Sequence, residues 1–354
     1  MTSFYAAIVT AIGIVLFLRK AWYNYNRLPK IPYVIGLDFP SVTVIIPARN
    51  EAANIARAIS GFPPESVIVV DDASTDDTAK IAAEAGARVI SAPPLPEGHL
   101  GKPNACMAGA NEASTDWLLF IDADTWYSRV FAPCLIEYAE DNELQMASVF
   151  LRQQCETLAE KALLPYAFAL YFTGVNASAV NHRRPTQWLA NGQCLLVQRE
   201  AYHRLGGHNA VAESVIEDVA LAKLAAEKGI HARVTRAEHM GNVRMYDGFQ
   251  AIWRGFQKNS FRFLQINPFT GLQVVMASTL LASWLPVILW LVQDKLYRQA
   301  ALFAIIPSVI LFPWYRSAAT LLAPLAIYGF QAIAINGMIT TLTGRKAIWK
   351  GREV

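Results

Sequence analysis

Two long apolar segments, one near each end of the chain, most strongly limit what this sequence can fold into. Residues 4–18 carry no charged side chain, and a second apolar zone begins near Leu272 and runs almost to the C-terminus. Hydrophobic residues make up 54% of the 354 residues, which is too many for an ordinary soluble domain of this size. The sequence therefore predicts a membrane protein with transmembrane helices at both ends.

The N-terminal segment predicts a transmembrane helix within residues 1–20. Arg19 and Lys20 directly follow the apolar run. A cleaved signal peptide is the alternative, but its basic residues would precede the apolar run and a small-x-small cleavage site would follow it. Because the basic flanks of membrane helices lie in the cytoplasm, we expect residues 21–260 to form the cytosolic domain of a multi-pass protein of the cell membrane.

The C-terminal region, residues 261–354, predicts two or three further spans. Residues 272–292 and 317–342 are each long enough to cross a bilayer, whereas residues 299–312 are short and contain a proline. The basic tail after Gly344 is expected in the cytoplasm, which requires an even number of crossings after the cytosolic domain. Two crossings meet this requirement, with residues 299–312 lying in the membrane interface.

Charge and cysteine content exclude several classes of protein. The formal net charge of +3 is too small to indicate nucleic-acid binding, and the basic residues cluster beside the membrane segments instead. The cysteines are far apart in the sequence and form no C-x-x-C pair, so neither a zinc site nor a disulfide framework is indicated. We expect small core residues in a reducing compartment at Cys106, Cys134, Cys155 and Cys194.

Strand and helix patterns alternate between the two membrane zones, from residue 40 to about residue 240. This alternation predicts an α/β fold with an open, mostly parallel sheet covered by helices on both faces. The first strand, residues 41–46, stops at Pro47, after which Asn50 is expected to cap a helix. The second strand, residues 67–70, stops at Asp71-Asp72. Ligands of such sheets bind at the carboxyl ends of the strands.

Asp122-Ala123-Asp124 closes the apolar run of residues 117–121, so two carboxylates emerge together where a buried strand meets solvent. Two acidic side chains one residue apart can share a hard divalent cation such as Mg²⁺ or Mn²⁺, whose open positions take phosphate oxygens. A D-x-D tripeptide alone occurs by chance in many loops. In this position the pattern makes Asp122 and Asp124 candidate metal ligands for a nucleotide diphosphate.

Four sequence blocks in this order resemble the nucleotide-sugar half of family 2 glycosyltransferases, which have a GT-A fold. The blocks are residues 44–51, 69–78, 101–105 and 122–124. The resemblance implies that the end of the first strand and the Asp-Asp turn hold the nucleoside, usually uridine, while the D-x-D holds a metal on the diphosphate. The implied donor-binding residues are Pro47, Ala48, Arg49, Asn50, Glu51, Asp71, Asp72 and Asp122. As isolated features they could also be a strand stop, a helix cap and a solvated turn.

Lys102 lies in the third of these blocks, after Gly101 and before Pro103-Asn104. That context puts its ammonium group at a helix start, where anions bind. The alternative is an ordinary exposed lysine. We therefore treat Lys102 as a candidate contact of the diphosphate.

The second half of the α/β region resembles the acceptor side of the same family. Asn191-Gly192-Gln193 forms a turn before an apolar strand and resembles the acceptor platform. Glu217-Asp218 resembles the E-D motif, whose aspartate takes the proton from the acceptor as a general base. The resemblance makes Asp218 the catalytic residue, with Glu217 beside it in the substrate site. The alternative is a pair of surface acids on an amphipathic helix.

Four further residues keep two interpretations each. His208 could donate to a phosphate or to the acceptor, or it could be a satisfied polar side chain where a helix stops. The segments 244–246, 255–259 and 349–352 are similar to carotenoid-pathway glycosyltransferases. This similarity puts Arg244, Arg254 and Lys258 near the diphosphate or the membrane entrance. These cations could equally flank an interfacial helix.

Two features bear on the acceptor. The Q-x-x-R-W motif of many processive family members is absent, and the predicted membrane helices are too few for a polymer channel, which favours transfer of a single sugar. Residues 162–180 are rich in Leu, Phe, Tyr and Ala and are expected to form a membrane-facing helix. This helix could deliver a lipid acceptor to Asp218.

Taken together, the resemblance implies an inverting, metal-dependent transfer of one hexose from a nucleotide diphosphate sugar to a lipid acceptor embedded in the membrane. UDP-glucose is the expected donor and a carotenoid the expected acceptor. A polyprenyl phosphate, a hopanoid or a sphingolipid-like alcohol are alternative acceptors that the motifs do not separate. An alternative of another class is an inactive membrane scaffold that has kept the GT-A fold.

Overall fold

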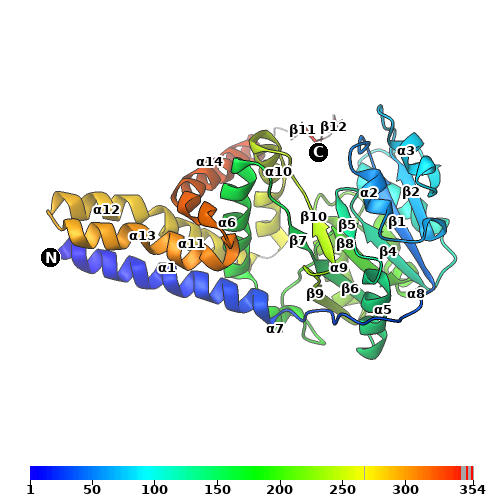
Figure 1. Cartoon of the computed structure of the whole chain (residues 1–354), viewed down its shortest axis with the longest axis horizontal. Coiled ribbons are helices and arrows are strands. Elements are labelled where there is room, and N and C mark those ends of the chain that lie inside the picture. The colour runs from blue at the N-terminus through cyan, green and yellow to red at the C-terminus, as the bar shows by residue number, and fades with distance from the viewer. Residues whose placement is uncertain (267, 344–347, 350–351, 354) are drawn as a thin grey trace.

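The molecule is elongated, with a bundle of helices at one end and an α/β domain at the other (Figure 1). The computed structural model describes the backbone of residues 1–266, 268–343, 348–349 and 352–353, and the side chains of residues 1–257, 268–340 and 343. The N-terminus lies at the far end of the bundle. The basic tail that the sequence predicts after Gly344 lies outside the residues whose side chains are described.

The sheet of the α/β domain has the strand order β3-β2-β1-β4-β8-β6-β9. Every neighbouring pair is parallel except the two pairs made by β8, which is antiparallel to β4 and β6. This confirms the predicted mostly parallel sheet. The strands are β1 (Val42–Ala48), β2 (Val67–Asp71), β3 (Arg88–Ser91), β4 (Trp117–Ile121), β6 (Met146–Phe150), β8 (Cys194–Gln198) and β9 (Ala232–Arg236).

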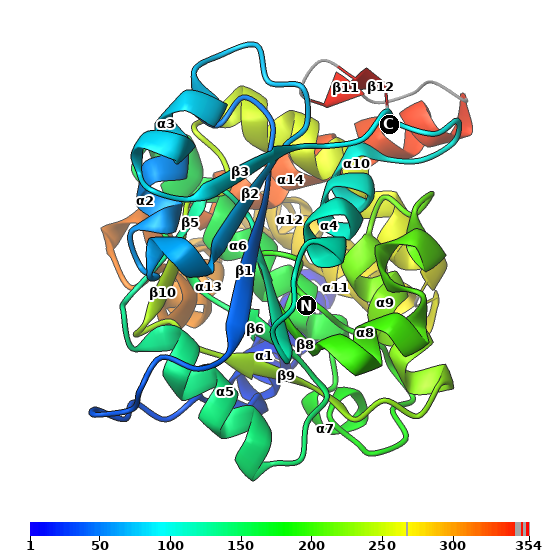
Figure 2. The same cartoon turned by 90° about the vertical axis from the view of Figure 1, so that its right-hand side faces the viewer.

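Helices cover both faces of this sheet (Figure 2). Helices α2 (Ile55–Ile59), α3 (Thr78–Glu84) and α5 (Phe131–Asp141) pack on one face, and α4 (Gly101–Asn111), α8 (Arg199–Leu205) and α9 (Glu217–Glu227) pack on the other. Because both faces are covered, the central strands are mostly apolar and almost fully buried. A β-carbon at Gly109 would lie 2.5 Å from Cγ2 of Ile45, so α4 needs a glycine where it crosses β1.

Four helices among the described residues are long and apolar enough to cross a membrane, judged by length and composition. They are α1 (Thr2–Arg27), the pair α11 (Pro268–Ala282) and α12 (Trp284–Gln293), α13 (Tyr297–Tyr315), and the 3-10 turn η3 (Ala318–Leu322) with α14 (Ala323–Leu342). Helix α1 is longer than the sequence predicts and continues past Arg19-Lys20. It ends at Leu28, which is extended because it precedes Pro29.

Helix α13 corrects the prediction that residues 299–312 are too short for a span. The helix has 19 residues, keeps Pro307 and Pro313 within its length, and packs against α1 and α12. Neighbouring helices can support the backbone that a proline leaves without a hydrogen bond. Helix α14 packs against α6 (Leu158–Gly174) and α10 (Phe249–Ile266). The number of segments that cross the membrane stays a prediction.

Helix α6 and the short helix α7 (Ala177–Val180) correspond to the membrane-facing helix predicted at residues 162–180. The helix breaks where Val175 is extended and Asn176 caps α7. Most side chains of α6 are buried against α1, α11, α13 and α14, so the helix lies inside the bundle instead of facing lipid. A helix that is apolar on all sides can either face lipid or be buried among other helices, and the packing of the bundle decides between the two.

The end of α1 is attached to β9, the edge strand of the sheet. The N–H of Arg236 donates to the carbonyl of Pro29 at 2.8 Å, and the N–H of Ile31 donates to the carbonyl of Arg236 at 3.0 Å. The guanidinium of Arg236 also donates to the carbonyl of Leu28 at 3.1 Å. The first membrane helix is thus joined to the sheet by backbone hydrogen bonds instead of a loose linker.

A second connection joins α6 to the loop after β4. The carboxylate of Glu160, which is fully buried, accepts from the guanidinium of Arg244 at 3.2 Å and from the N–H of Glu156 at 2.7 Å. The backbone N–H of Arg244 donates to the carbonyl of Asp124 at 3.1 Å. One arginine therefore links a helix of the bundle to the D-x-D segment.

Replacing Glu160 with glutamine is expected to lower the free energy of unfolding by about 3 kcal/mol, because the partly buried guanidinium of Arg244 then keeps only the exposed carboxylate of Glu156 as a charged partner. The matched control is Glu156→Gln. Glu156 contacts the same guanidinium at 2.6 Å, but its side chain is 62% exposed, so its loss is expected to cost less than about 1 kcal/mol. Thermal unfolding of both variants in detergent tests this difference, and equal shifts would contradict it.

Candidate active site

The loops that follow β1 and β2 are hydrogen-bonded to each other at the carboxyl ends of these strands. The N–H of Asp72 donates to the carbonyl of Ala48 at 2.8 Å, and the guanidinium of Arg49 donates to the carbonyl of Asp72 at 2.6 Å. The N–H of Glu51 donates to the hydroxyl of Thr78 at 2.8 Å. The residues predicted to hold the nucleoside therefore form one continuous wall.

Asn50 does not cap a helix, contrary to the sequence prediction. Its φ angle is 54°, and α2 begins only at Ile55. The side-chain oxygen of Asn50 instead accepts from the N–H of Thr75 at 2.8 Å, so tertiary contact outweighs the local capping preference. Ala73 in the facing turn also has a φ of 54°. Left-handed backbone at residues other than glycine is uncommon and is often found at functional sites.

Asp71 has an oxygen that suits a ligand. Its Oδ2 accepts from the N–H of Ser74 at 3.3 Å, whereas its Oδ1 is buried with no hydrogen-bond partner among the described residues. Buried acceptors are usually satisfied in proteins. A donor on a bound molecule, such as a base N–H, would satisfy this one.

Asp122 and Asp124 follow β4, as the sequence predicts, and both are partly buried. The N–H of Asp122 donates to the carbonyl of Gln193 at 3.2 Å, which ties the D-x-D segment to the turn before β8. A small sheet, β5 (Thr125–Tyr127), β10 (Gly241–Val243) and β7 (Arg152–Gln153), continues from the segment. Because β8 runs antiparallel, its first residues meet the carboxyl ends of the parallel strands.

The ammonium group of Lys102 lies among the acidic side chains. Its Nζ is 2.7 Å from Oδ1 of Asp122 and 3.0 Å from Oε1 of Glu217. Burial alone would lower the pKa of Lys102, but these two carboxylates outweigh it and hold the pKa well above its usual value. Lys102 is therefore charged and bridges the D-x-D segment to the E-D segment.

Asp218 lies next to Glu217 in the first turn of α9 and lines the same cavity as Lys102. Its Oδ2 accepts from the N–H of Gly192 at 2.7 Å, and its Oδ1 accepts from the N–H of Val219 at 2.8 Å. Burial, and then the charge of Glu217, raise the pKa of Asp218 to about 6, against the opposite effect of Lys102. A β-carbon at Gly192 would lie 3.2 Å from both Asp218 Oδ2 and Lys102 Nζ, so a side chain there would push against both groups.

His208 is buried against the same site. Its Nδ1 is 2.7 Å from the hydroxyl of Tyr202, and its ring meets the edge of Phe120 at 4.7 Å between centroids. Burial lowers the pKa of His208 to about 4, so the ring is neutral at neutral pH. The histidine is thus a satisfied polar side chain that also borders the cavity.

One cavity of about 270 Å³ brings the donor-side and acceptor-side residues together. Glu217 is buried in its wall, which does not fit the alternative of a surface acid. The lining residues are Pro47, Lys102, Cys106, Phe120, Ile121, Asp122, Gly192, Leu195, His208, Glu217 and Asp218. The turn residues Asn191 and Gln193 border Gly192, and their side chains are hydrogen-bonded to each other at 3.0 Å.

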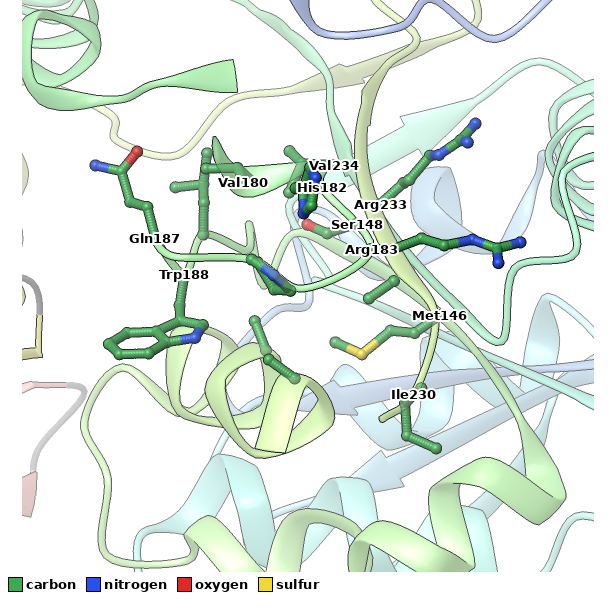
Figure 3. Close-up of a pocket in the computed structure, with 15 residues that line it drawn as sticks. Met146, Ser148, Val180, His182, Arg183, Gln187, Trp188, Ile230, Arg233 and Val234 are labelled. Carbon is green, nitrogen blue, oxygen red and sulfur yellow. The ribbon is translucent and has the colours of Figure 1, made fainter. Parts of the chain in front are cut away.

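A second hollow, of about 440 Å³, contains none of the predicted site residues (Figure 3). Its centre is apolar, with Met146, Val180 and Ile230. Figure 3 shows the guanidinium groups of Arg183 and Arg233 extending away from this centre. The lining of the hollow includes these two arginines but no acidic residue, so it lacks the carboxylates of the acidic cavity.

The structure does not bring every predicted residue to the cavity. The predicted metal ligand Asp124 does not line it, and neither do the predicted nucleoside residues Ala48, Arg49, Asn50, Glu51, Asp71 and Asp72. Arg254 is exposed on α10 and does not line it, and the side chain of Lys258 lies outside the described residues. Sequence reasoning missed the apolar walls, Phe120 and Leu195, which carry no chemical signature. It also missed the Arg244–Glu160 pair, although T-x-x-E at residues 157–160 is a recognisable helix-start pattern.

Comparison with known proteins identifies the α/β domain. Residues 43–206 match the model of the family described as "Glycosyl transferase family 2". The chain contains a family 2 glycosyltransferase domain. The matched region includes the loops after β1 and β2, Lys102, the D-x-D segment and the Asn191–Gln193 turn, and it ends before Glu217.

Curated relatives include 4,4'-diaponeurosporenoate glycosyltransferases of Staphylococcus aureus. The protein of strain USA300 is 29% identical over 238 residues, which are 64% of this chain and 62% of that protein. The protein of the bovine strain RF122 / ET3-1 is 29% identical over 266 residues, which are 72% of this chain and 68% of that protein. The first alignment therefore spans less than two thirds of the relative's length.

A solved structure extends the likeness to nearly the whole fold. The mannosyltransferase PcManGT from Pyrobaculum calidifontis, in complex with GDP-Man and Mn²⁺, has a TM-score of 0.59. The match covers 98% of this chain and 99% of that chain, with 21% sequence identity. This chain therefore has a GT-A-like α/β fold, as predicted, and the similarity includes most of its terminal apolar helices.

The acidic residues fit a divalent metal only in part. Among the residues that the structure describes, no group of three His, Cys, Asp or Glu side chains is arranged to hold a metal ion. Asp122 and Asp124 supply two carboxylates, the oxygen ligands that Mg²⁺ and Mn²⁺ prefer. Their number suits an ion that takes its remaining ligands from a diphosphate and water.

Proposed function

We propose that the chain is an inverting glycosyltransferase that moves one hexose from a nucleotide diphosphate sugar, UDP-glucose, to a lipid acceptor in the membrane. The observation that carries this proposal is the acidic cavity, where Lys102 pairs with Asp122 of the D-x-D segment and with Glu217, and where Asp218 lines the same wall. The family domain supports the reaction class. These features also argue against an inactive scaffold, because the acidic residues of the site are all present.

The donor is assigned to the wall formed by Pro47, Ala48, Arg49, Asn50, Glu51, Asp71 and Asp72. The buried free oxygen of Asp71 supports a base with an N–H group, as uracil has. Asp122 and Asp124 would hold Mg²⁺ or Mn²⁺, and the metal would neutralise charge on the departing diphosphate. A solved neighbour that holds Mn²⁺ and a nucleotide sugar supports this arrangement.

A membrane lipid is proposed as the acceptor because the acidic cavity lies close to the helical bundle. Tyr171 of the buried helix α6 is near enough to Asp218 for the carboxylate to contribute, after burial, to the raised pKa of its phenol. Helix α6 therefore connects the general base to helices that are apolar enough to span a membrane. The curated relatives, named for a carotenoid acid, support a carotenoid as the acceptor.

The proposed chemistry is a single displacement at the anomeric carbon. Asp218 removes the proton of an acceptor hydroxyl as the new glycosidic bond forms and the bond to the diphosphate breaks. The Gly192 N–H and the start of α9 hold the carboxylate in place. The cytosolic side is proposed for this site, since the basic flank of α1 leads into the α/β domain.

The test uses the full chain in lipid nanodiscs with UDP-glucose, UDP-galactose and GDP-mannose, each with Mn²⁺, Mg²⁺ or EDTA. Metal-dependent release of the nucleotide together with a new glycolipid in the mass spectrum supports the proposal. Supplying a carotenoid acid, a polyprenyl phosphate, a hopanoid and a sphingolipid-like alcohol in turn identifies the acceptor. Absence of nucleotide binding and release with every donor would overturn the proposed activity.

Transfer to a hydroxyl acceptor is expected to fall below a pH of about 6. The pKa of Asp218 is raised to about 6, chiefly by burial, and a general base acts only when it is deprotonated. The rate should therefore drop about tenfold per pH unit below that value and stay level above it. A profile of kcat/KM between about pH 5 and 8 checks this. A flat profile through pH 6 would contradict the assignment.

A further inference from the structure

Lys102 occupies a position that conflicts with metal binding. Its ammonium group is 2.7 Å from Oδ1 of Asp122, one of the two carboxylates assigned to the metal, and 3.0 Å from Glu217. A third contact, to the carbonyl of Gly192 at 3.5 Å, is long. A cation bound by Asp122 would lie beside this ammonium group and be repelled by it.

The contacts of Lys102 are strong in this environment. The side chains of Asp122 and Glu217 are 28% and 11% exposed, so water screens the pairs only partly. Charge-assisted hydrogen bonds of this length are the stronger kind. Without a ligand, a metal ion must therefore break an existing ion pair to gain one carboxylate.

We propose that Lys102 makes metal binding depend on the nucleotide. In the absence of the donor, its ammonium group takes the place of the metal as counter-ion of Asp122. When a diphosphate enters, the ammonium group turns to the phosphate oxygens and releases Asp122, so that the metal and the diphosphate bind together. This inference rests on the proposed function, because it takes a nucleoside diphosphate as the ligand.

Two opposite effects are expected when Lys102 is replaced by methionine, which has a similar length and no charge. The affinity for Mn²⁺ alone should rise about tenfold, because the two carboxylates of Asp122 and Glu217 lose their internal cation. The affinity for UDP in the presence of Mn²⁺ should fall about tenfold, because one phosphate contact is lost. Both values lie within the range of about 5- to 150-fold that is usual for coupled sites.

The experiment measures free Mn²⁺ by electron paramagnetic resonance as the full chain in nanodiscs is titrated, with and without UDP. The control is Lys223→Met, which removes an exposed lysine from α9, the helix that carries Asp218. This control is expected to match the wild type in both titrations. Lys102→Gln, which keeps hydrogen bonds to the carboxylates, takes the place of the methionine variant if that variant does not fold.

Tighter Mn²⁺ binding without UDP in the Lys102 variant supports the proposal. Unchanged or weaker Mn²⁺ binding overturns it, since the ammonium group would then not compete with the metal. A wild-type chain that binds Mn²⁺ but no nucleoside diphosphate would refute the proposed function instead. The titration without UDP therefore reports on Lys102 alone, and the titration with UDP reports on the donor.

Discussion

Replacing Asp124 with alanine is expected to abolish glycosyl transfer while leaving the protein folded. The variant removes one of the two carboxylates proposed to hold the metal on the diphosphate. Loss of such stabilisation of a departing group typically costs at least about 10²-fold in rate. The hydrogen bond from Arg244 is to the backbone carbonyl of Asp124, so the mutation leaves this connection in place.

Release of UDP at saturating donor and Mn²⁺ measures the effect of Asp124→Ala, and thermal unfolding reports on the fold. The control is Asp141→Ala, which removes an exposed carboxylate from α5. This helix packs on the face of the sheet opposite to α4 and α9, which carry Lys102 and Asp218. Its activity should equal that of the wild type. Metal-independent activity in Asp124→Ala near the wild-type rate would refute the D-x-D assignment.

Replacing Asp218 with asparagine is expected to lower kcat by about 10²- to 10⁴-fold with a hydroxyl acceptor, the usual cost of losing a general base. Asparagine keeps the size of the side chain and can still accept from the N–H of Gly192. It cannot take the acceptor's proton. The KM for the donor should change little, because Asp218 lies on the acceptor side of the cavity.

The size of this loss also reports the chemistry of the acceptor. A carboxylate acceptor is already ionised at neutral pH, so it needs no base and should suffer far less. Comparing a lipid alcohol with a carotenoid acid in the same variant separates the two cases. A near-normal rate with a proven hydroxyl acceptor would exclude Asp218 as the base and direct attention to Glu217 or Glu213.

The sequence predicts the sheet well because the features that mark a buried strand lie within the strand itself or directly after it. Apolar runs that stop at Pro47, Asp71 and Asp122 mark buried strands, and the structure places all three ends at one edge of the sheet. Two errors have physical causes outside the local sequence. Asn50 bonds to Thr75 from a distant loop instead of capping a helix, and α6, apolar on every side, is covered by other helices.

The candidate site was only partly predictable. The sequence marks Asp122, Lys102 and Asp218 as separate features, but their joint position depends on β8, whose antiparallel direction has no sequence signal. The ion pairs of Lys102 depend on distances across the cavity. The sequence likewise does not separate Arg244 from Arg254, since nothing local to Arg244 shows that Glu160 lies opposite it.

The attachment of α1 to β9 has a consequence for the choice of substrate. In the proposed membrane arrangement, a helix fixed in the bilayer and hydrogen-bonded to the sheet cannot raise or lower the α/β domain freely. The distance between the membrane surface and Asp218 is then constant. The protein would then select lipids whose reactive group lies at the same distance from the membrane surface as Asp218, whatever the length of the lipid's hydrocarbon chain.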